Sequence, residues 1–333
     1  MIEHHGPGDH AAGIPAEIFQ QRELLLGELQ LDPAAARFPA NQVQFQVGNA
    51  QAGGLRLVGC TAAEQGPEAG QQFGDGVCRE QIGAIFFVSV TGLSSPSVDA
   101  RLVNRMGLPR NVKRNPIFGL GCVAGAAGLA RAADYVRAYP DQVALLLSIE
   151  LCSLTFQRDD VSAANLISAG LFGDGAAAVL VAGSNVQSTG PKIIASHQAF
   201  YPDTQDVMGW KVSEKGFQIV LSPDVPKVVR ENLGNDVDTF LAAHSLTRKD
   251  IGTWIMHTGG PKVLEASAEA LGLPDSALEV SWDALRRVGN LSSASVLVVL
   301  DEVMRNRRPE PGTKSILAAM GPGFCAEILL LEW

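Results

Sequence analysis

The stretch IGAIFFVSV, residues 82–90, decides the fold class of this chain. Its length and its β-branched and aromatic residues predict a strand buried inside a sheet. The elements expected after it are a turn at 91–97, a helix from about Val98 to Met106, a strand-like IFGLG at 117–121 and a long helix from about Ala124 to Ala138. Tyr139-Pro140 ends that helix, because a proline restricts the residue before it.

The next three expected elements complete a first half, and the elements after residue 214 repeat much of its order. The expected elements are strand 143–151, short helix 165–171, strand 176–183, helix 224–244, strand 253–257, helix 261–271, a helix after Asn290, and strands 315–321 and 326–333. The repeat of strand, helix, helix and two strands predicts a layered α/β fold with two similar halves. The connection at 184–214 is less apolar and is the best candidate boundary. We therefore divide the chain into residues 1–81, 82–183 and 184–333.

Composition excludes several classes of protein. The chain has 333 residues, 46% apolar and 18% charged, with 35 glycines and a formal net charge of −9. This supplies a sizeable core and excludes disorder or a coiled coil for the whole chain. The acidic balance argues against nucleic acid or an anionic membrane surface as the main partner. Five cysteines without a CxxC pair indicate neither a zinc site nor a disulfide framework.

The N-terminus lacks the basic start and apolar stretch of a signal peptide, and no run of about 18 apolar residues occurs. We therefore expect a cytoplasmic protein without a membrane span.

Cys122, in GLGCVAGAAGLARAADY (119–135), is the first candidate for chemistry. It is expected at the start of a helix, where the helix dipole and free N–H groups stabilise a thiolate and lower the pKa of the thiol. The small residues around it would let the helix approach the sheet closely. The alternative is a buried, inert cysteine.

His257 and Asn290 are the second and third candidates. His257 ends an apolar strand and precedes a Gly-Gly-Pro turn, at the kind of sheet edge where ligands bind in open α/β folds. Asn290 precedes the last long helix. Taken singly, the histidine could be structural and the asparagine a helix N-cap or a turn residue. Together with Cys122 they form a Cys, His, Asn set spread over two duplicated halves.

Five motifs now point to one family. GLGCVAGAAGL resembles the nucleophile segment of the type III polyketide synthases, the chalcone-synthase-like branch of the thiolase fold. Four further motifs follow in the same order: LFGDGAAAVLV at 171–181, MHTGGPKVLEA at 256–266, GNLSSASVLVVLDE at 289–302 and GPGFCAEILLLEW at 321–333. The resemblance covers about residues 82–333, and ELCSLTFQRDD at 150–160 is closest to the bacterial alkylpyrone and alkylresorcinol synthases.

The resemblance implies a homodimeric acyltransferase with the thiolase fold, in an αβαβα layered arrangement of two βαβαβαββ-type halves. Cys122 would accept the acyl group of a starter acyl-CoA, and His257 would stabilise its thiolate as an ion pair. His257 and Asn290 would donate hydrogen bonds to the thioester oxygen of malonyl-CoA as it loses carbon dioxide. No metal, nicotinamide or flavin is implied, because coenzyme A arrives with the substrates.

The resemblance also implies residues that shape the substrate path. Phe172 matches an aromatic gatekeeper whose apolar face promotes loss of the malonyl carboxylate, and Phe217 matches a second gatekeeper between the CoA tunnel and the cavity. The side chains expected to line the cavity are Thr91, Cys152, Thr155 and Ser292. The product would be a pyrone, a resorcinol or a related aromatic.

The resemblance is weak over residues 1–81, which contain no lysine. They show no clear first strand and no helix with the basic residues that hold the CoA phosphates in the family. Either this segment is divergent, or a frame error changed the upstream coding sequence. Two other functions stay open: a condensing enzyme resembling ketoacyl-carrier-protein synthase III, and a non-catalytic thiolase-fold subunit impaired by its altered N-terminus.

Overall fold

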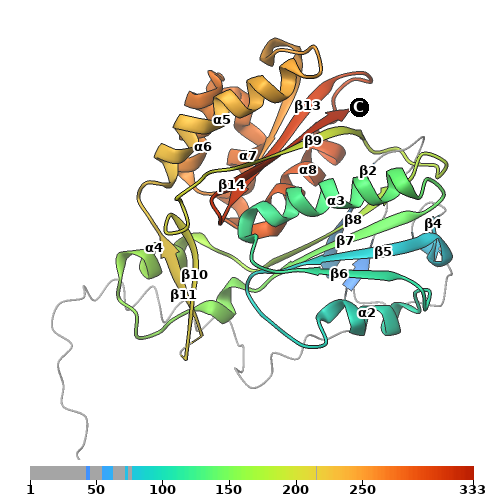
Figure 1. Cartoon of the computed structure of the whole chain (residues 1–333), viewed down its shortest axis with the longest axis horizontal. Coiled ribbons are helices and arrows are strands. Elements are labelled where there is room, and N and C mark those ends of the chain that lie inside the picture. The colour runs from blue at the N-terminus through green and yellow to red at the C-terminus, as the bar shows by residue number, and fades with distance from the viewer. Residues whose placement is uncertain (1–42, 46–54, 63–71, 74–76, 215) are drawn as a thin grey trace, which may run out of the picture. The chain divides into compact units, whose positions relative to one another are not determined.

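The computed structural model describes residues 43–45, 55–62, 72–73, 77–214 and 216–333 (Figure 1). Up to residue 182 the elements are β1 (Val43–Phe45), β2 (Leu55–Ala62), β3 (Gln72–Phe73), β4 (Val77–Cys78), β5 (Ile82–Val88), α2 (Val98–Met106), β6 (Lys113–Ile117), α3 (Ala124–Ala138), β7 (Val143–Glu150), α4 (Ala163–Leu171) and β8 (Gly175–Ala182). The later ones are β9 (Lys192–Phe200), β10 (Met208–Ser213), β11 (Gly216–Leu221), α5 (Val225–Ala242), β12 (Ile251–Met256), α6 (Pro261–Leu271), α7 (Glu279–Val288), α8 (Ser295–Asn306), β13 (Lys314–Gly321) and β14 (Cys325–Glu332). No helix in these ranges is long and apolar enough to cross a membrane.

The two main sheets repeat one plan. The first has the strand order β1-β2-β8-β7-β5-β6 and the second the order β12-β13-β14-β9. The run β2-β8-β7-β5 corresponds to β9-β14-β13-β12: in each, the first two pairings are antiparallel and the third is parallel. The duplication predicted from the sequence is therefore confirmed at the level of strand order and direction.

The layers follow from side chains that alternate between the faces of each strand. In β7, Leu146 belongs to a core shared with α3 and α8, whereas its neighbour Leu145 belongs to the outer core of the first sheet. In β13, Leu317 faces the shared core and Ile316 the outer core of the second sheet. Figure 1 shows α3 and α8 between the sheets, with α2 outside the first and α5 and α6 outside the second. Strands with both faces buried explain the continuous apolar runs of the sequence.

Three sequence expectations need correction. Only Ile117 of the stretch 117–121 belongs to a strand, because Gly119 and Gly121 have φ angles of +94° and +53°, which turn the chain out of the sheet. The strand here is β6, whose sequence KRNPI is polar and contains a proline, so its pattern did not reveal it. The connection at 184–214 carries β9, in which exposed and less exposed residues alternate. The segment 1–81, in which no first strand was recognised, contributes β2 to the first sheet.

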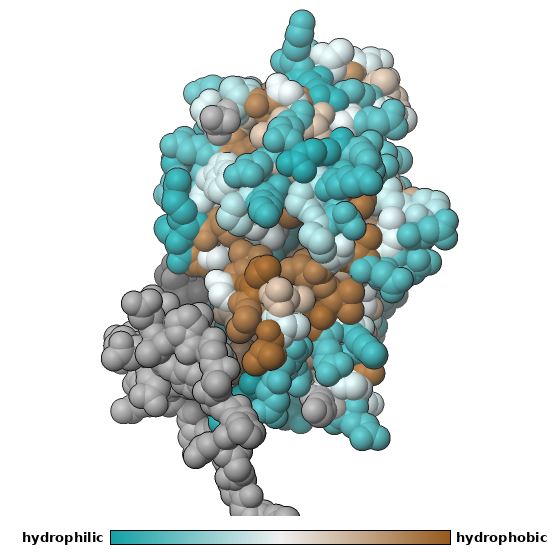
Figure 2. Space-filling model, turned by 90° about the vertical axis from the view of Figure 1, so that its left-hand side faces the viewer, coloured by the Kyte–Doolittle hydropathy of each residue, from teal (hydrophilic) through white to brown (hydrophobic). Residues whose placement is uncertain are grey.

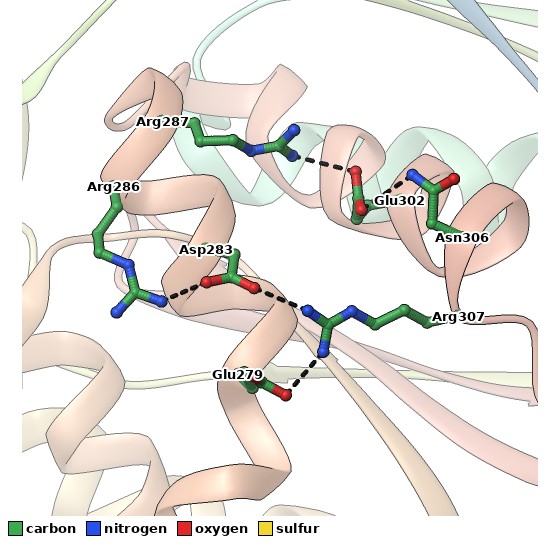
Figure 3. Close-up of polar contacts among 7 residues, drawn as sticks. All are labelled: Glu279, Asp283, Arg286, Arg287, Glu302, Asn306 and Arg307. Atoms are coloured by element: carbon green, nitrogen blue, oxygen red, sulfur yellow. Dashed lines mark hydrogen bonds and ion pairs between the residues drawn. The ribbon is translucent and has the colours of Figure 1, made fainter.

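Ion pairs on the surface join α7 to α8 (Figure 3). Arg287 contacts Glu302 at 3.1 Å, and Arg307, just after α8, contacts Glu279 at 2.7 Å and Asp283 at 2.9 Å. Exposed pairs stabilise a fold by at most about 1 kcal/mol each. They join α7 and α8, the two helices on either side of the connection that carries Asn290.

A close approach of α3 to the start of α8 positions the site. A Cβ added to Gly125 in α3 would lie 2.1 Å from the backbone oxygen of Ser293, in the 3₁₀ turn η6 (Ser292–Ala294) that precedes α8. Only a glycine permits this distance.

We expect Gly125→Ala to destabilise the protein by about 2–3 kcal/mol or more, because the new methyl group collides with backbone. Helix propensity alone predicts the opposite sign. Gly170→Ala in α4 is the matched control, since its Cβ would meet nothing within 4 Å, and it should change stability by less than about 1 kcal/mol. Urea unfolding of both variants measures the difference, and equal midpoints would contradict the close packing.

Candidate active site

Cys122 lies where the first half turns from sheet to helix. After β6 the chain passes Gly121 and enters η2 (Gly121–Val123), which leads into α3. Gly121 adopts φ +53°, and a Cβ there would lie 2.6 Å from Pro322 Cδ, so the turn is packed directly against the GPG loop. The side chain of Cys122 is buried, and its Sγ donates to Ser292 Oγ at 3.8 Å. The structure thus brings together two predicted site residues from different halves.

The backbone of Asn290 makes two hydrogen bonds to the segment at the end of α4. Its N–H donates to Leu171 O at 2.9 Å, and its C=O accepts from Gly173 N at 2.9 Å. Phe172 and Asn290 therefore form a short parallel β-bridge. Backbone hydrogen bonds therefore hold Phe172, the predicted gatekeeper, next to Asn290, whose amide is the predicted catalytic group.

His257 follows β12, and its N–H donates to Ala318 O in the neighbouring strand at 3.0 Å. The ring is buried, and Nδ1 has no hydrogen-bond partner among the described residues. Burial lowers the pKa of His257 to about 4, so the imidazole is neutral at pH 7. Asn290 Nδ2 donates to Gly259 O at 3.4 Å, which brings the histidine loop next to the asparagine.

The electrostatics of Cys122 differ from the sequence expectation. Burial raises the pKa of its thiol to about 12, and the charge of Glu150 raises it further, although hydrogen bonds with Ser292 and Asn290 act in the opposite direction. The prediction of a lowered pKa at the helix start is therefore not met, because desolvation is the largest contribution at this buried position. Burial thus favours the uncharged form of both Cys122 and His257.

The four predicted cavity residues occupy two places. Ser292 lies against Cys122, as described. Thr91, Cys152 and Thr155 cluster at the end of β7: Thr91 Oγ1 accepts from Leu151 N at 2.8 Å, and Thr155 Oγ1 donates to Cys152 O at 2.8 Å in η3 (Cys152–Thr155). Cys152 is buried, and the nearby charges of Glu150 and Cys122 add to burial in raising the pKa of its thiol.

Phe217, the second predicted gatekeeper, belongs to an aromatic cluster. Its ring lies 6.0 Å from that of Trp210 across the β10–β11 hairpin and 6.1 Å from that of Phe118. Phe118 stands four residues before Cys122 and is 43% exposed. The hairpin and the turn leading to the thiol thus share an apolar contact at the surface.

Glu150 is a residue whose importance the sequence reasoning missed. Its buried carboxylate accepts from Val90 N and from Thr91 Oγ1, each at 3.0 Å, and from the Ser293 hydroxyl of η6. Burial raises its pKa, while these donors act against that rise. The carboxylate ties the first half to the turn that holds Ser292. The sequence signal that could have identified it is a charged glutamate at the end of an otherwise apolar strand.

No group of three or more His, Cys, Asp or Glu side chains that could hold a metal ion occurs in the described ranges.

The chain is similar to known proteins over more than three quarters of its length. The model of the chalcone and stilbene synthase N-terminal domain matches residues 56–185, and that of the C-terminal domain matches 192–332. A 1,3,6,8-tetrahydroxynaphthalene synthase of Streptomyces peucetius is 54% identical over 78% of this chain and 69% of its own length. A putative chalcone synthase of Bacillus subtilis is 41% identical over 78% and 73%. The crystal structure of the tetrahydroxynaphthalene synthase of Streptomyces coelicolor, a bacterial type III polyketide synthase, superposes with a TM-score of 0.74 at 34% identity, covering 77% of this chain and 72% of that one. The predicted thiolase-like fold is confirmed.

The state of the Cys122 thiol can be tested by alkylation. Because only the thiolate reacts, a thiol with a pKa of about 12 should be alkylated by iodoacetamide about tenfold faster for each pH unit from 7 to 10, without a plateau. Peptide mass spectrometry of Cys122 measures the rate, and N-acetylcysteine, which levels off above about pH 8.5, is the reference. A rate that is flat between pH 6 and 8 would instead show a thiolate paired with His257.

Proposed function

The chain belongs to the chalcone and stilbene synthase family of type III polyketide synthases, and we propose that it carries an acyl-CoA starter on Cys122 and extends it with malonyl-CoA. The observation that supports this most directly is the meeting of three segments from two halves. Cys122, Ser292 and Asn290 are in contact, and the histidine loop joins them through Gly259.

Loading begins with a neutral thiol. As Cys122 Sγ attacks the thioester carbon of the starter, its proton passes to His257, whose neutral ring can accept it. The coenzyme A thiolate then leaves and takes that proton. The starter is left on Cys122 as a thioester, and His257 returns to its neutral form.

Extension needs a carbanion equivalent, which malonyl-CoA supplies when its carboxylate leaves as carbon dioxide. The electron pair of the broken C–C bond moves into the thioester, and Asn290 Nδ2–H and the His257 ring N–H donate to the developing enolate oxygen. The enolate carbon attacks the acyl group on Cys122, and the Cys122 thiolate leaves. Phe172 presents an apolar surface beside Asn290, which disfavours the charged carboxylate over carbon dioxide.

We propose a pyrone, a resorcinol or a related aromatic as the product, after cyclisation in a space shaped by Thr91, Cys152, Thr155 and Ser292. The reaction as written needs no metal, nicotinamide or flavin, because the carbanion arises from carbon dioxide loss. We also propose that the enzyme works in the cytoplasm, which fits the free thiols of Cys78, Cys122, Cys152 and Cys325.

We further propose that it acts as a homodimer. Figure 2 shows apolar side chains gathered on the side of the molecule where α4 and the β10–β11 hairpin lie in Figure 1. The more than half-exposed apolar residues of η3 and α4 are Leu154, Leu166 and Ile167. Apolar surface of this kind is usually buried in assemblies.

Purified protein given malonyl-CoA and a panel of acyl-CoA starters should release carbon dioxide and form polyketides that mass spectrometry identifies. Cys122→Ala should abolish polyketide formation, because no thioester can form, whereas the buried Cys325→Ala should keep most of it. Activity with malonyl-carrier protein but not with malonyl-CoA would favour a ketoacyl synthase instead. Neither carbon dioxide nor polyketide with any donor would favour a non-catalytic subunit.

Light scattering coupled to size exclusion should give twice the 35.1 kDa of the chain. A monomeric mass at micromolar concentration would overturn the proposed dimer.

A further inference from the structure

The amide of Asn290 has one orientation because its oxygen is occupied twice. Oδ1 accepts from Ser292 N at 2.8 Å and from Ser295 Oγ at 3.3 Å. The amide nitrogen is therefore the group that faces Gly259 and Cys122. Rotated by 180°, the amide would present an acceptor where the reaction develops negative charge, which is repulsive.

The Ser295 hydroxyl accepts one hydrogen bond and donates another, so its proton has a defined direction. Its oxygen accepts from Leu291 N at 2.7 Å. Asn290 Oδ1 can only accept, so the Ser295 proton must point toward it. The side chain is 2% exposed, so bulk water does not compete for either bond.

The local fold keeps this geometry in place. Ser295 is the first residue of α8, and the preceding η6 turn is entered through Ser292 in the left-handed region, at φ +52°. That conformation aims the Ser292 N–H back at Asn290. Gly125 of α3 packs directly against the same turn.

We propose that Ser295 is a positioning residue for the reaction: its hydroxyl holds the Asn290 amide with Nδ2 directed at Cys122 and at the reacting thioester. The inference rests on the proposed function for its kinetic consequence. Its structural consequence, the hydrogen bond from Asn290 to Cys122, is independent of that function.

The test compares Ser295→Ala, Ser295→Thr and Ser267→Ala in the full chain. Ser267 is an equally buried serine whose hydroxyl donates to Val263 O within α6, away from the site. Ser295→Ala should lower kcat for malonyl-CoA decarboxylation by about 2- to 12-fold, the rate equivalent of one neutral hydrogen bond, with KM unchanged. Ser295→Thr keeps the hydroxyl and should recover most of the rate, and Ser267→Ala should match the wild type.

A second readout does not need turnover. Without the oriented amide, Cys122 loses a hydrogen bond that favours its thiolate, so iodoacetamide should alkylate Cys122 more slowly in Ser295→Ala than in Ser267→Ala at pH 9. Equal alkylation rates and equal kcat in these two variants would overturn the positioning role. If the wild type fails to decarboxylate malonyl-CoA while the alkylation difference remains, the proposed function fails and the assignment of Ser295 stands.

Discussion

The contact between the start of α3 and the turn before α8 is the constraint on which the site depends. Gly125 brings one helix so close to the Ser293 carbonyl that no side chain fits between them. Since Cys122 stands three residues before Gly125 and Ser292 one residue before Ser293, the same contact sets the distance between thiol and hydroxyl. The buried Glu150 carboxylate holds this turn from the other side, so the halves are joined by packing and by hydrogen bonds at one place.

Burial determines the chemistry of the resting site. It raises the pKa of Cys122 and lowers that of His257, so both groups are neutral at pH 7. Keeping Cys122 and His257 uncharged at rest costs less than burying an ion pair of the two in the same place. Burial also strengthens any hydrogen bond made to an oxyanion that forms later. Hydrogen-bond donors at this site would therefore act most strongly on charge that appears during the proposed reaction.

The sequence predicted most of the fold, and it identified candidate site residues in segments that the structure brings together, because both depend on local patterns. Helix α3, bounded at Ala124 and Ala138, follows from apolar periodicity and the Tyr139-Pro140 stop. The Cys, His and Asn set was found because each residue sits in a recognisable motif. Strand β6 was missed because its sequence, with Pro116, is polar. The raised pKa of Cys122 could not be predicted, because desolvation depends on packing between the two halves. Ser292, which contacts Cys122, lies 170 residues later in the sequence.

The duplication of the two halves explains why two helix N-termini lie at the site. In the first half α3 precedes the strand pair β7–β8, and in the second half α8 precedes the equivalent pair β13–β14. The two helices therefore occupy equivalent positions, and their N-termini meet beside Cys122 and Asn290. Each contributes a partial positive charge there. At the resting thiol, desolvation is the largest contribution and raises the pKa to about 12. In the proposed reaction, an enolate oxygen forming between the same two helix starts would face both dipoles and the Asn290 N–H, which together offset part of the cost of burying its charge.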